Sequence, residues 1–469
     1  MGPTVNPNAP LRPPAARTRY RAPAWTPPPG VTQPTFVYGP STTENNPMRK
    51  LAFYAGLAML LTTCCILPEL LFDITHTDTY LLYLVYPPAL FGAFLTGSIK
   101  RTFGERAAWY WFFFFLWMVV AVPFSSWRGQ SFMDIYGYAR INIPLLIIVG
   151  GLATTWQEVR TMLYTMGISG LITVIASRSF TTNEGGRVSM GNGSIGNPND
   201  LAAHLVMFLP FMALIVIDPK RNIVFRLGVL LPAIGYGLYL ILGTASRGGL
   251  LSLVAMFLVM LWGAPGAKRV MVLALAAILA LALPALLPDS TRQRLASLMG
   301  AEHEEAKESQ QSREYLFKKS VTYTLEHPLV GVGPNQFANY EGKQSISEGK
   351  IGNWHATHCA FTQVSSECGV PALLFFLLSI GSALGLVLKT HRQARRLGYK
   401  EIQNTCLCYI VSLIGFMVSI TFLANAYRFY LPVMVGVAIV MTTVARKIMN
   451  PVPAPVAVPT AAPRPFAVR

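Results

Sequence analysis

Charged residues are scarce in this sequence, at 13% of its 469 residues. Soluble domains carry about 25% charged residues, so the chain has too little polar surface for a water-soluble enzyme with a large core. Hydrophobic residues make up 52%, and the mean hydropathy is +0.43. Apolar runs of about 20 residues recur along the chain, which is the length that crosses a hydrocarbon layer of about 30 Å. The sequence therefore predicts a polytopic membrane protein.

The sequence also lacks the motifs that bind metals and nucleotides. No Cys/His spacing matches a zinc site, and no Walker or dinucleotide-binding glycine motif is present. Gly331–Phe337 shares glycines with phosphate-binding loops but has neither their lysine nor their preceding strand, which favours a tight turn. Cys359 and Cys368, if both lie on one helix, are about 13 Å apart, too far for a disulfide. We therefore predict no metal and no cofactor.

Twelve apolar segments predict transmembrane helices. They lie near residues 51–72, 80–97, 108–125, 140–155, 161–177, 201–217, 224–243, 249–263, 269–287, 370–389, 405–424 and 429–445. With the N-terminus in the cytoplasm, 24 of the 38 lysines and arginines fall on the cytoplasmic side when both tails are counted. Eight of the other 14 lie in one long external loop, so the short external loops carry only six, as the positive-inside rule requires. The net charge of +17 therefore orients the chain in its membrane, and we expect no nucleic-acid partner.

The same segments divide the chain into five parts. Residues 1–48 and 447–469 are rich in proline and predict disordered cytoplasmic tails. Residues 49–287 hold the first nine predicted helices, and residues 370–446 hold the last three. Between them, residues 288–369 form one long external (periplasmic) loop that contains short helices. The expected fold class is an all-α polytopic membrane protein with about 12 transmembrane helices.

Polar residues at membrane depth are the most informative residues in such a protein. Asn197-Pro-Asn-Asp200 directly precedes the apolar segment 201–217. Asn197 can cap that helix, and Pro198 suits its first turn. Asp200 and His204 are four residues apart and share a helical face. Two interpretations of Asp200 and His204 stay open: they form a buried polar pair inside the bundle, or they contact the substrate.

Ser246-Arg247-Gly248 lies in a very short connection between two apolar segments, which holds Arg247 at the mouth of the bundle. One interpretation is an arginine whose guanidinium reaches lipid headgroups. The other is a phosphate site, because a guanidinium presents paired N–H donors to two phosphate oxygens. Short external loops here carry only six lysines and arginines in total, and Gly248-Gly249 permits close backbone approach. Both features favour the phosphate site.

The loop 288–369 has a helical periodicity of its own. Phe317, Val321 and Leu325 follow helical spacing. Arg313 lies four residues before Phe317, so it shares their face. We expect this face to be directed toward the membrane or the bundle.

Two histidines follow in Trp354-His-Ala-Thr-His-Cys-Ala-Phe-Thr-Gln363. Histidine is the one side chain that exchanges a proton near neutral pH without a shifted pKa. Taken singly, either His355 or His358 is more often structural than catalytic. Two arginines and a histidine on one face of a membrane bundle form a more specific arrangement.

At these residues the sequence resembles the O-antigen ligase family, which includes O-antigen polymerases and bacterial O-oligosaccharyltransferases. The resemblance extends from about Asn197 to Lys389, and its pieces follow the family's order. They are Asn197-Pro-Asn-Asp-Leu-Ala202, Ser246-Arg247-Gly248, Arg313 with the amphipathic helix after it, His327-Pro-Leu-Val-Gly-Val-Gly-Pro-Asn-Gln-Phe337, and His358 near Glu367-Cys-Gly369. Each piece alone is weak, whereas the ordered set with one long external loop is fairly specific.

The resemblance implies a GT-C-like, metal-independent glycosyltransferase in the bacterial cytoplasmic (inner) membrane. Both termini would be cytoplasmic, and the loop 288–369 would be the external catalytic loop. The donor would be a glycan on undecaprenyl diphosphate. The acceptor would be lipid A core, another glycan or a protein hydroxyl. In-line attack opposite the leaving group would invert the anomeric centre.

The resemblance also implies roles for individual residues. Arg247 and Arg313 would hold the diphosphate, and His358 would approach the acceptor hydroxyl. Cys359 stands where the family usually has asparagine, and His355 leaves the assignment of the histidine open. The expected substrate-binding residues beside the two arginines are Asn199, Asp200, His355, Gln363 and Glu367.

A carrier is the alternative from another class, because twelve helices also suit a lipid-linked glycan flippase or another polytopic transporter. Transporters commonly show two similar halves with broken helices at the midplane. Here the long loop and the polar clusters all fall in the second half of the chain. The enzyme is therefore the leading hypothesis, and a scaffold that docks partners through the Pro-rich tail explains neither Arg247 nor the loop.

Overall fold

A computed structural model describes residues 47–264, except 185, 186 and 192, and residues 304–450, except 353. Residues 266, 269–270, 273–274 and 292 are described between these two stretches. The predicted tails therefore lie outside the described residues, apart from Pro47, Met48 and residues 447–450. Most of the predicted span 269–287 lies outside them as well.

The described chain is almost entirely helical, which confirms an all-α polytopic architecture. The first half contains α1 (Pro47–Cys64), α2 (Leu67–Thr75), α3 (Leu81–Leu95), α4 (Ser98–Thr102), α5 (Arg106–Ala121), η1 (Val122–Phe124), α6 (Arg128–Gly151), α7 (Trp156–Phe180), α8 (Pro198–Val216), η2 (Phe225–Leu230) and α9 (Leu231–Gly243). The second half contains α10 (Arg247–Gly263), α13 (Glu304–Glu326), α14 (Phe337–Ser347), α15 (Ala360–Leu397), α16 (Lys400–Ile420) and α17 (Tyr430–Met449). One short antiparallel hairpin, β1 (Thr182–Glu184) with β2 (Arg187–Ser189), joins α7 to α8 and pairs Asn183 with Val188.

Eight of the described helices are long and apolar enough to cross a membrane, and α1 with α2 adds a ninth if this pair, bent by 62°, is one span. The helices α3 and α10 are apolar but shorter. Each predicted segment overlaps a helix, except 269–287, which is largely undescribed. The total of twelve spans therefore stays a prediction.

Two helices begin ten or more residues before their predicted segments. α6 begins at Arg128 rather than near residue 140. The first turns of α6 pack against protein, where the Ser131 hydroxyl donates to the carbonyl of Pro334 at 2.9 Å. Because these turns contact protein rather than lipid, they need no apolar run, and apolar length alone did not detect them. α15 begins at Ala360, and its backbone breaks at Gly369, where φ is 83° and ψ is 173°. The last turns of the predicted loop thus precede the break, and the predicted span follows it.

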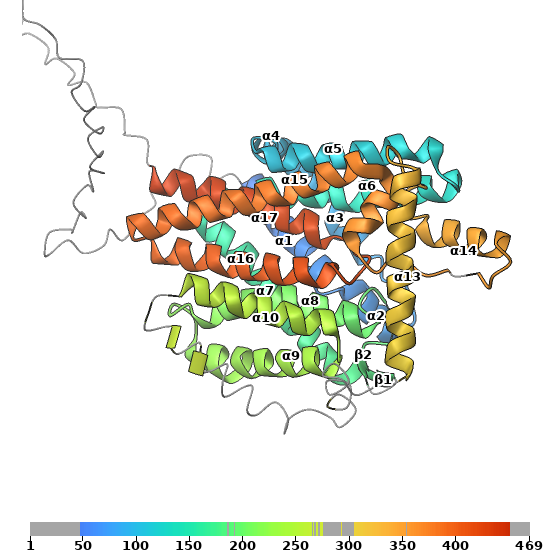
Figure 1. The fold of residues 1–469 in the computed structure, drawn as a ribbon. Coiled ribbons are helices and arrows are strands. Elements are labelled where there is room, and N and C mark those ends of the chain that lie inside the picture. Colours follow the sequence, from blue (N-terminus) through green and yellow to red (C-terminus); the bar gives the residue numbers. More distant parts are fainter. Residues whose placement is uncertain are drawn as a thin grey trace, which may run out of the picture. The chain divides into compact units, whose positions relative to one another are not determined.

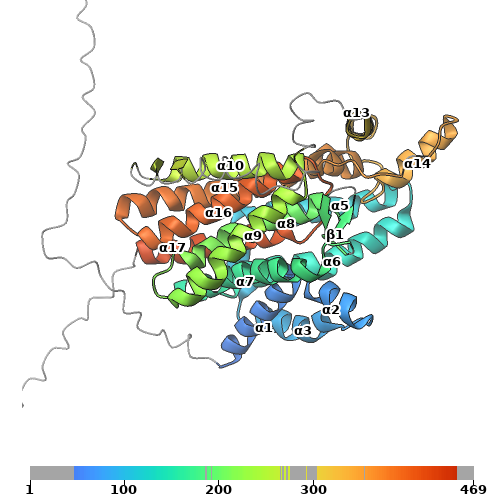
Figure 2. The same cartoon turned by 90° about the horizontal axis from the view of Figure 1, so that it is seen from below.

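The spanning helices run side by side, and α13 crosses one end of the bundle at a steep angle to them (Figure 1). α8 lies deepest in the bundle, with 83% of its apolar window buried, whereas α9 lies at the periphery with 22% buried. Figure 2 shows the same bundle from below, with α1 to α3 on one side and α10 on the other. The central position of α8 explains how Asp200 and His204 come to be buried inside a largely apolar core.

Ion pairs gather at the end of the bundle that the charge pattern assigns to the cytoplasm. The Arg49 guanidinium pairs with Glu158 at 2.6 Å, and Arg160 pairs with Asp218 at 2.5 Å. Glu158 also completes a capping box with Thr155 at the start of α7. Because α7 and α8 are consecutive antiparallel helices, the start of α8 lies at the opposite end, together with the polar motifs of the loop.

Candidate functional site

Arg247 is the first residue of α10. The Ser246 side chain caps this helix by accepting the backbone N–H of Gly249 at 3.2 Å. A Cβ on Gly248 would lie 3.1 Å from the Phe422 ring, and one on Gly249 would lie 3.0 Å from Cβ of Ala202. The two glycines therefore let the start of α10 pack closely against α8 and the α16–α17 connection, which fixes the backbone that carries Arg247.

Arg313 lies on α13, at the edge of the face that packs against the protein. Leu316 and Ser320 on that face are fully buried. The Thr324 and Ser365 hydroxyls, 2.8 Å apart, join α13 to α15. Burial and the guanidinium of Arg247 both lower the pKa of Arg313. The two arginines therefore interact electrostatically, although 66 residues separate them in the sequence.

His358 lies just before α15 and is half-buried. Its φ of 54° places it in the left-handed region, which few residues other than glycine adopt. Burial, the charge of Arg313 and the neighbouring His355 lower the pKa of His358 from its ordinary 6.5 to about 4. The imidazole is therefore neutral at pH 7 and can accept a proton. His355, in contrast, is exposed.

The glycine-rich segment 331–337 wraps around Glu367. The backbone N–H of Asn335 donates to Oε2 of Glu367 at 3.0 Å, and that of Phe337 donates to Oε1 at 3.2 Å. Gly331 has a φ of 65°, and a Cβ there would lie 2.3 Å from the Glu367 carbonyl carbon. The turn predicted for this segment therefore has a specific partner. Because its carboxylate is occupied and it is only 3% exposed, Glu367 suits a positioning role better than the predicted contact to substrate.

The connection between α16 and α17 links the two polar motifs, and the sequence interpretation missed it. Gln363 of α15 accepts the backbone N–H of Ala426 at 3.2 Å. The Asn425 amide donates to Asp200 of α8 at 2.7 Å. The Tyr427 hydroxyl is hydrogen-bonded to Glu367. The signal that could have revealed this connection is the short polar stretch Asn425-Ala-Tyr-Arg428 between the apolar segments 405–424 and 429–445.

The start of α8 has the predicted cap. Oδ1 of Asn197 accepts the backbone N–H groups of Asn199 and Asp200 at 2.9 and 3.0 Å. His204, which is fully buried, contacts Thr173 at 3.2 Å and the Tyr430 hydroxyl at 3.1 Å. Asp200 bonds to asparagine side chains instead. The structure thus gives the two residues separate partners, which argues against a direct Asp200–His204 pair.

Two further arginines reach this end of the bundle. Arg187 of β2 donates to Oδ1 of Asn199 and to the carbonyl of Thr244, both at 2.8 Å. Arg428 donates to the carbonyl of Ser194 at 3.1 Å. The contacts of Arg187 join the hairpin to the start of α8 and to the end of α9, and the contact of Arg428 joins the start of α17 to the connection between β2 and α8. The positions of Arg187 and Arg428 depend on how the short connections between helices fold. The apolar periodicity of the sequence does not predict that folding.

The thiols of Cys359 and Cys368 are both free and buried. Within the described part of the chain, no group of three or more His, Cys, Asp or Glu side chains could hold a metal ion. The charged or titratable side chains that lower the pKa of His358 are Arg313 and the neighbouring His355.

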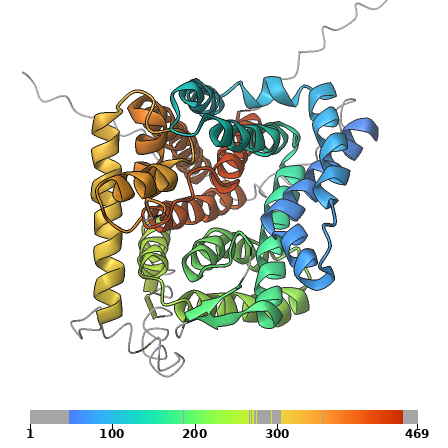
Figure 3. The ribbon, with the colours of Figure 1, turned by 90° about the vertical axis from the view of Figure 1, so that its right-hand side faces the viewer.

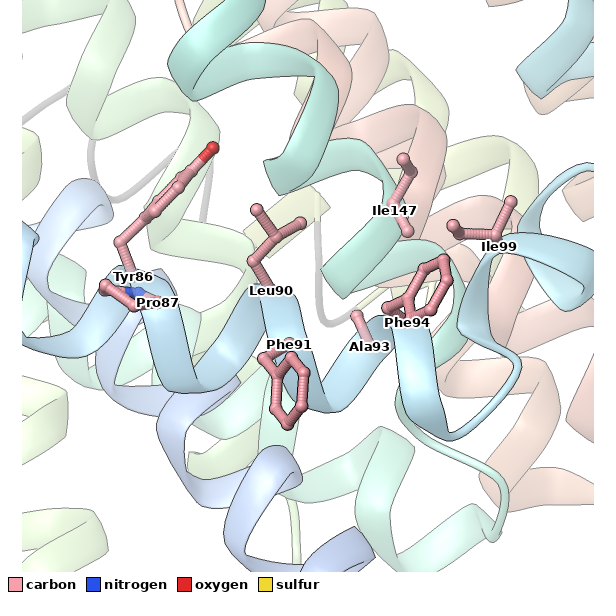
Figure 4. Close-up of a pocket in the computed structure, with 8 residues that line it drawn as sticks. All are labelled: Tyr86, Pro87, Leu90, Phe91, Ala93, Phe94, Ile99 and Ile147. Atoms are coloured by element: carbon pink, nitrogen blue, oxygen red, sulfur yellow. The ribbon is translucent and has the colours of Figure 1, made fainter.

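An apolar cavity of about 490 Å³ lies elsewhere, between α3 and α6 (Figure 4). It is lined by Tyr86, Pro87, Leu90, Phe91, Ala93, Phe94, Ile99 and Ile147. The end-on view in Figure 3 places α3 on the opposite side of the bundle from α10 and α13. This cavity therefore lies apart from the arginines and His358.

The match to a known family follows the same residues. A model of the family described as O-antigen ligase matches residues 232–377. This segment is similar to the O-antigen ligase family. The matched segment contains Arg247, Arg313 and His358, whereas Asn199 and Asp200 precede it. No curated protein matches the chain. The match to this family, with the apolar helices, supports a glycosyltransferase-like bacterial membrane enzyme, and the family implies a lipid-linked glycan and an acceptor as partners.

Proposed function

We propose that this protein transfers a glycan from undecaprenyl diphosphate to a hydroxyl group of lipid A core, of another glycan or of a protein. The observation that carries the proposal is that Arg313 interacts electrostatically with both Arg247 and His358. The three residues belong to α10, to α13 and to the connection before α15, and all lie within the segment that matches the O-antigen ligase family. The site lies at the end of the bundle opposite the ion pairs. We assign this end to the periplasmic face of the inner membrane.

The two arginines suit a diphosphate. Two guanidiniums repel each other when they are held close in a partly buried site. A bound polyanion attracts both guanidiniums, and this attraction offsets the repulsion between them. Each guanidinium can donate paired N–H groups to phosphate oxygens. As the bond from the anomeric carbon to the phosphate oxygen breaks, negative charge grows on the leaving group. Fixed cations stabilise that charge, so the step needs no metal.

His358 suits the general base. Its lowered pKa keeps the imidazole neutral at pH 7, so a ring nitrogen can accept the proton of the acceptor hydroxyl. The acceptor oxygen then bonds to the anomeric carbon while undecaprenyl diphosphate leaves from the opposite side, which inverts the centre. Before the next turnover, the imidazolium returns its proton to solvent.

The remaining predicted residues would support these three. Asn199, Asp200 and Gln363 lie at the same end of the bundle, where we place the approach to the site. His355, exposed beside His358, would contact the acceptor. Glu367 would act as a positioning residue, because its carboxylate holds the backbone of segment 331–337 in place.

The test is a deletion strain complemented with wild type, His358→Ala or His355→Ala at equal protein levels. We expect His358→Ala to lose surface polysaccharide and to accumulate undecaprenyl-linked glycan at the periplasmic face. The size of the stalled glycan separates the acceptors: single repeats indicate a polymerase, and long chains indicate a ligase. Arg396→Ala, an exposed change in the last turn of α15, is the matched control and should behave as wild type.

Full rescue by His358→Ala would contradict its role as the base and would make His355 the next candidate. A flippase gives a different result, because lipid-linked glycan then accumulates on the cytoplasmic face. An added glycosidase that cannot cross the membrane distinguishes the two faces in spheroplasts.

A further inference from the structure

α13 exposes an apolar stripe although it belongs to the loop between spans. Phe317 is 48% exposed, Val321 38% and Leu325 75%. Residues four apart in a helix lie above one another on one face, so these side chains form a continuous line. The neighbouring face carries the buried Leu316 and Tyr323. α13 therefore has one face covered by protein and one apolar face without a partner among the described residues.

The position of α13 shows what lies beside that stripe. α13 packs against α15, and Figure 1 shows it crossing the ends of the spanning helices. Seen along the bundle in Figure 3, it runs along the margin, outside α10. Figure 2, in which α13 is seen end-on, agrees and places it beyond the start of α10. Such a helix overhangs the edge of the bundle, where lipid surrounds the spans.

The apolar helix α10, outside which α13 runs, has a surface of the kind that faces lipid. On α10, Leu251, Val254 and Leu258 are 49%, 54% and 58% exposed. On α13, the stripe is bordered on its far side by the exposed pair Glu314–Lys318, whose charged atoms lie 2.7 Å apart. An apolar line edged by charge is the pattern of a helix that lies in the membrane surface with its charges in the headgroup layer.

We infer that α13 lies in the plane of the external leaflet, with Phe317, Val321 and Leu325 among the acyl chains of the bilayer. Arg313 stands between this stripe and the buried face, so the seating of α13 sets the height of its guanidinium above the hydrocarbon. The partner is the phospholipid surface itself. The inference concerns placement in the membrane and holds whether or not the proposed transfer reaction is correct.

The experiment measures membrane depth at single positions. Cysteine replaces Phe317, Val321 or Leu325 in the full chain, with Thr322→Cys as the matched control on another exposed face of α13. The native cysteines, five of them buried and Cys408 half-buried, are replaced beforehand. Each variant receives a nitroxide label and is reconstituted in vesicles of phosphatidylethanolamine and phosphatidylglycerol. Power saturation then compares collisions with oxygen and with a water-soluble nickel chelate.

We expect the ratio of oxygen to nickel accessibility to be at least threefold higher at the stripe than at residue 322. Equal ratios would overturn the inference, because the stripe would then lie in water. Low accessibility to both reagents would also overturn it, since protein would then cover the stripe, either the predicted span 269–287 or a second copy of the chain. Repeating the measurement in the His358→Ala protein keeps this result separate from any loss of transfer.

Discussion

Removing the charge of Arg313 tests the proposed mechanism most sharply, because the proposal gives this guanidinium two separable effects. It would stabilise the leaving diphosphate, and its charge lowers the pKa of His358. Arg313→Gln keeps a polar but shorter side chain and removes the charge together with the paired N–H donors of the guanidinium. Losing one group that stabilises transition-state charge typically lowers kcat by about 10²–10³-fold, and we expect a loss of that size.

The second effect appears in the pH dependence. A base must be unprotonated, so activity falls as pH falls through the pKa of His358, which is about 4 in the wild type. The lowered value has three causes, of which burial is the largest and Arg313 the second. Arg313→Gln removes only the second cause, so the pKa should rise to a value between about 4 and the ordinary 6.5. The acid limb of kcat/KM, which reports the free enzyme, should move up by the same amount.

At pH 7.5 His358 is neutral in both proteins, so the rate loss measured there reflects the leaving group alone. The assay follows release of undecaprenyl diphosphate by purified protein in nanodiscs, with lipid-linked glycan isolated from the deletion strain as donor. Arg247→Gln is the matched control, because Arg247 is not among the causes of the lowered pKa of His358. It should lower kcat by a similar factor and leave the acid limb in place. Identical acid limbs in wild type and Arg313→Gln would refute the electrostatic coupling, and an unchanged kcat would refute the diphosphate role.

Three substitutions test the scaffold around these residues. Glu367→Ala leaves two backbone amides of segment 331–337 without their acceptor, at about 1–3 kcal/mol each, and should speed amide exchange there; unchanged exchange would contradict the contact. Gly331→Ala forces a Cβ into a left-handed residue 2.3 Å from a backbone carbon and should lower Tm by several degrees, whereas Gly235→Ala, with open space around it, should not. Asp200→Ala removes the acceptor of an amide from residues 421–429 and should loosen that connection by about 1–3 kcal/mol, as measured by faster exchange; protection equal to wild type would argue against this link.

The sequence predicted the features that depend on local pattern. Apolar length located the described spans, because contact with lipid imposes that length on each helix separately. The cap at Asn197 followed from its position before Pro198, since a cap depends on neighbouring residues only. The break at Gly369 lies where the loop was expected to end.

Features that depend on contacts between distant segments were out of reach. The early start of α6 was missed because its first turns pack on the loop at Pro334 and need no apolar run. The anchoring roles of Arg187 and Arg428 were missed because each donates to a backbone carbonyl far along the chain, that of Thr244 and that of Ser194. Glu367 was assigned to substrate because the sequence does not show that two backbone amides already occupy its carboxylate.

Backbone conformation adds an independent argument for where the chemistry lies. Six described non-glycine residues have positive φ. Three of them, Ile66, His76 and Tyr80, border the ends of α2 and α3, where the chain bends sharply.

The other three are Ala245 beside Arg247, Asn335 in the segment around Glu367, and His358 itself. Residues held in such conformations cost about 1–3 kcal/mol each and persist only where surrounding contacts fix them. Here those contacts are the Ser246 cap, the Glu367 carboxylate and the hydrogen bonds between Thr357 and Cys359. All three positions lie in the segment that matches the O-antigen ligase family. Backbone strain of this kind is expected where a side chain must be held in one orientation. It therefore favours His358 over the exposed His355 as the histidine whose orientation matters.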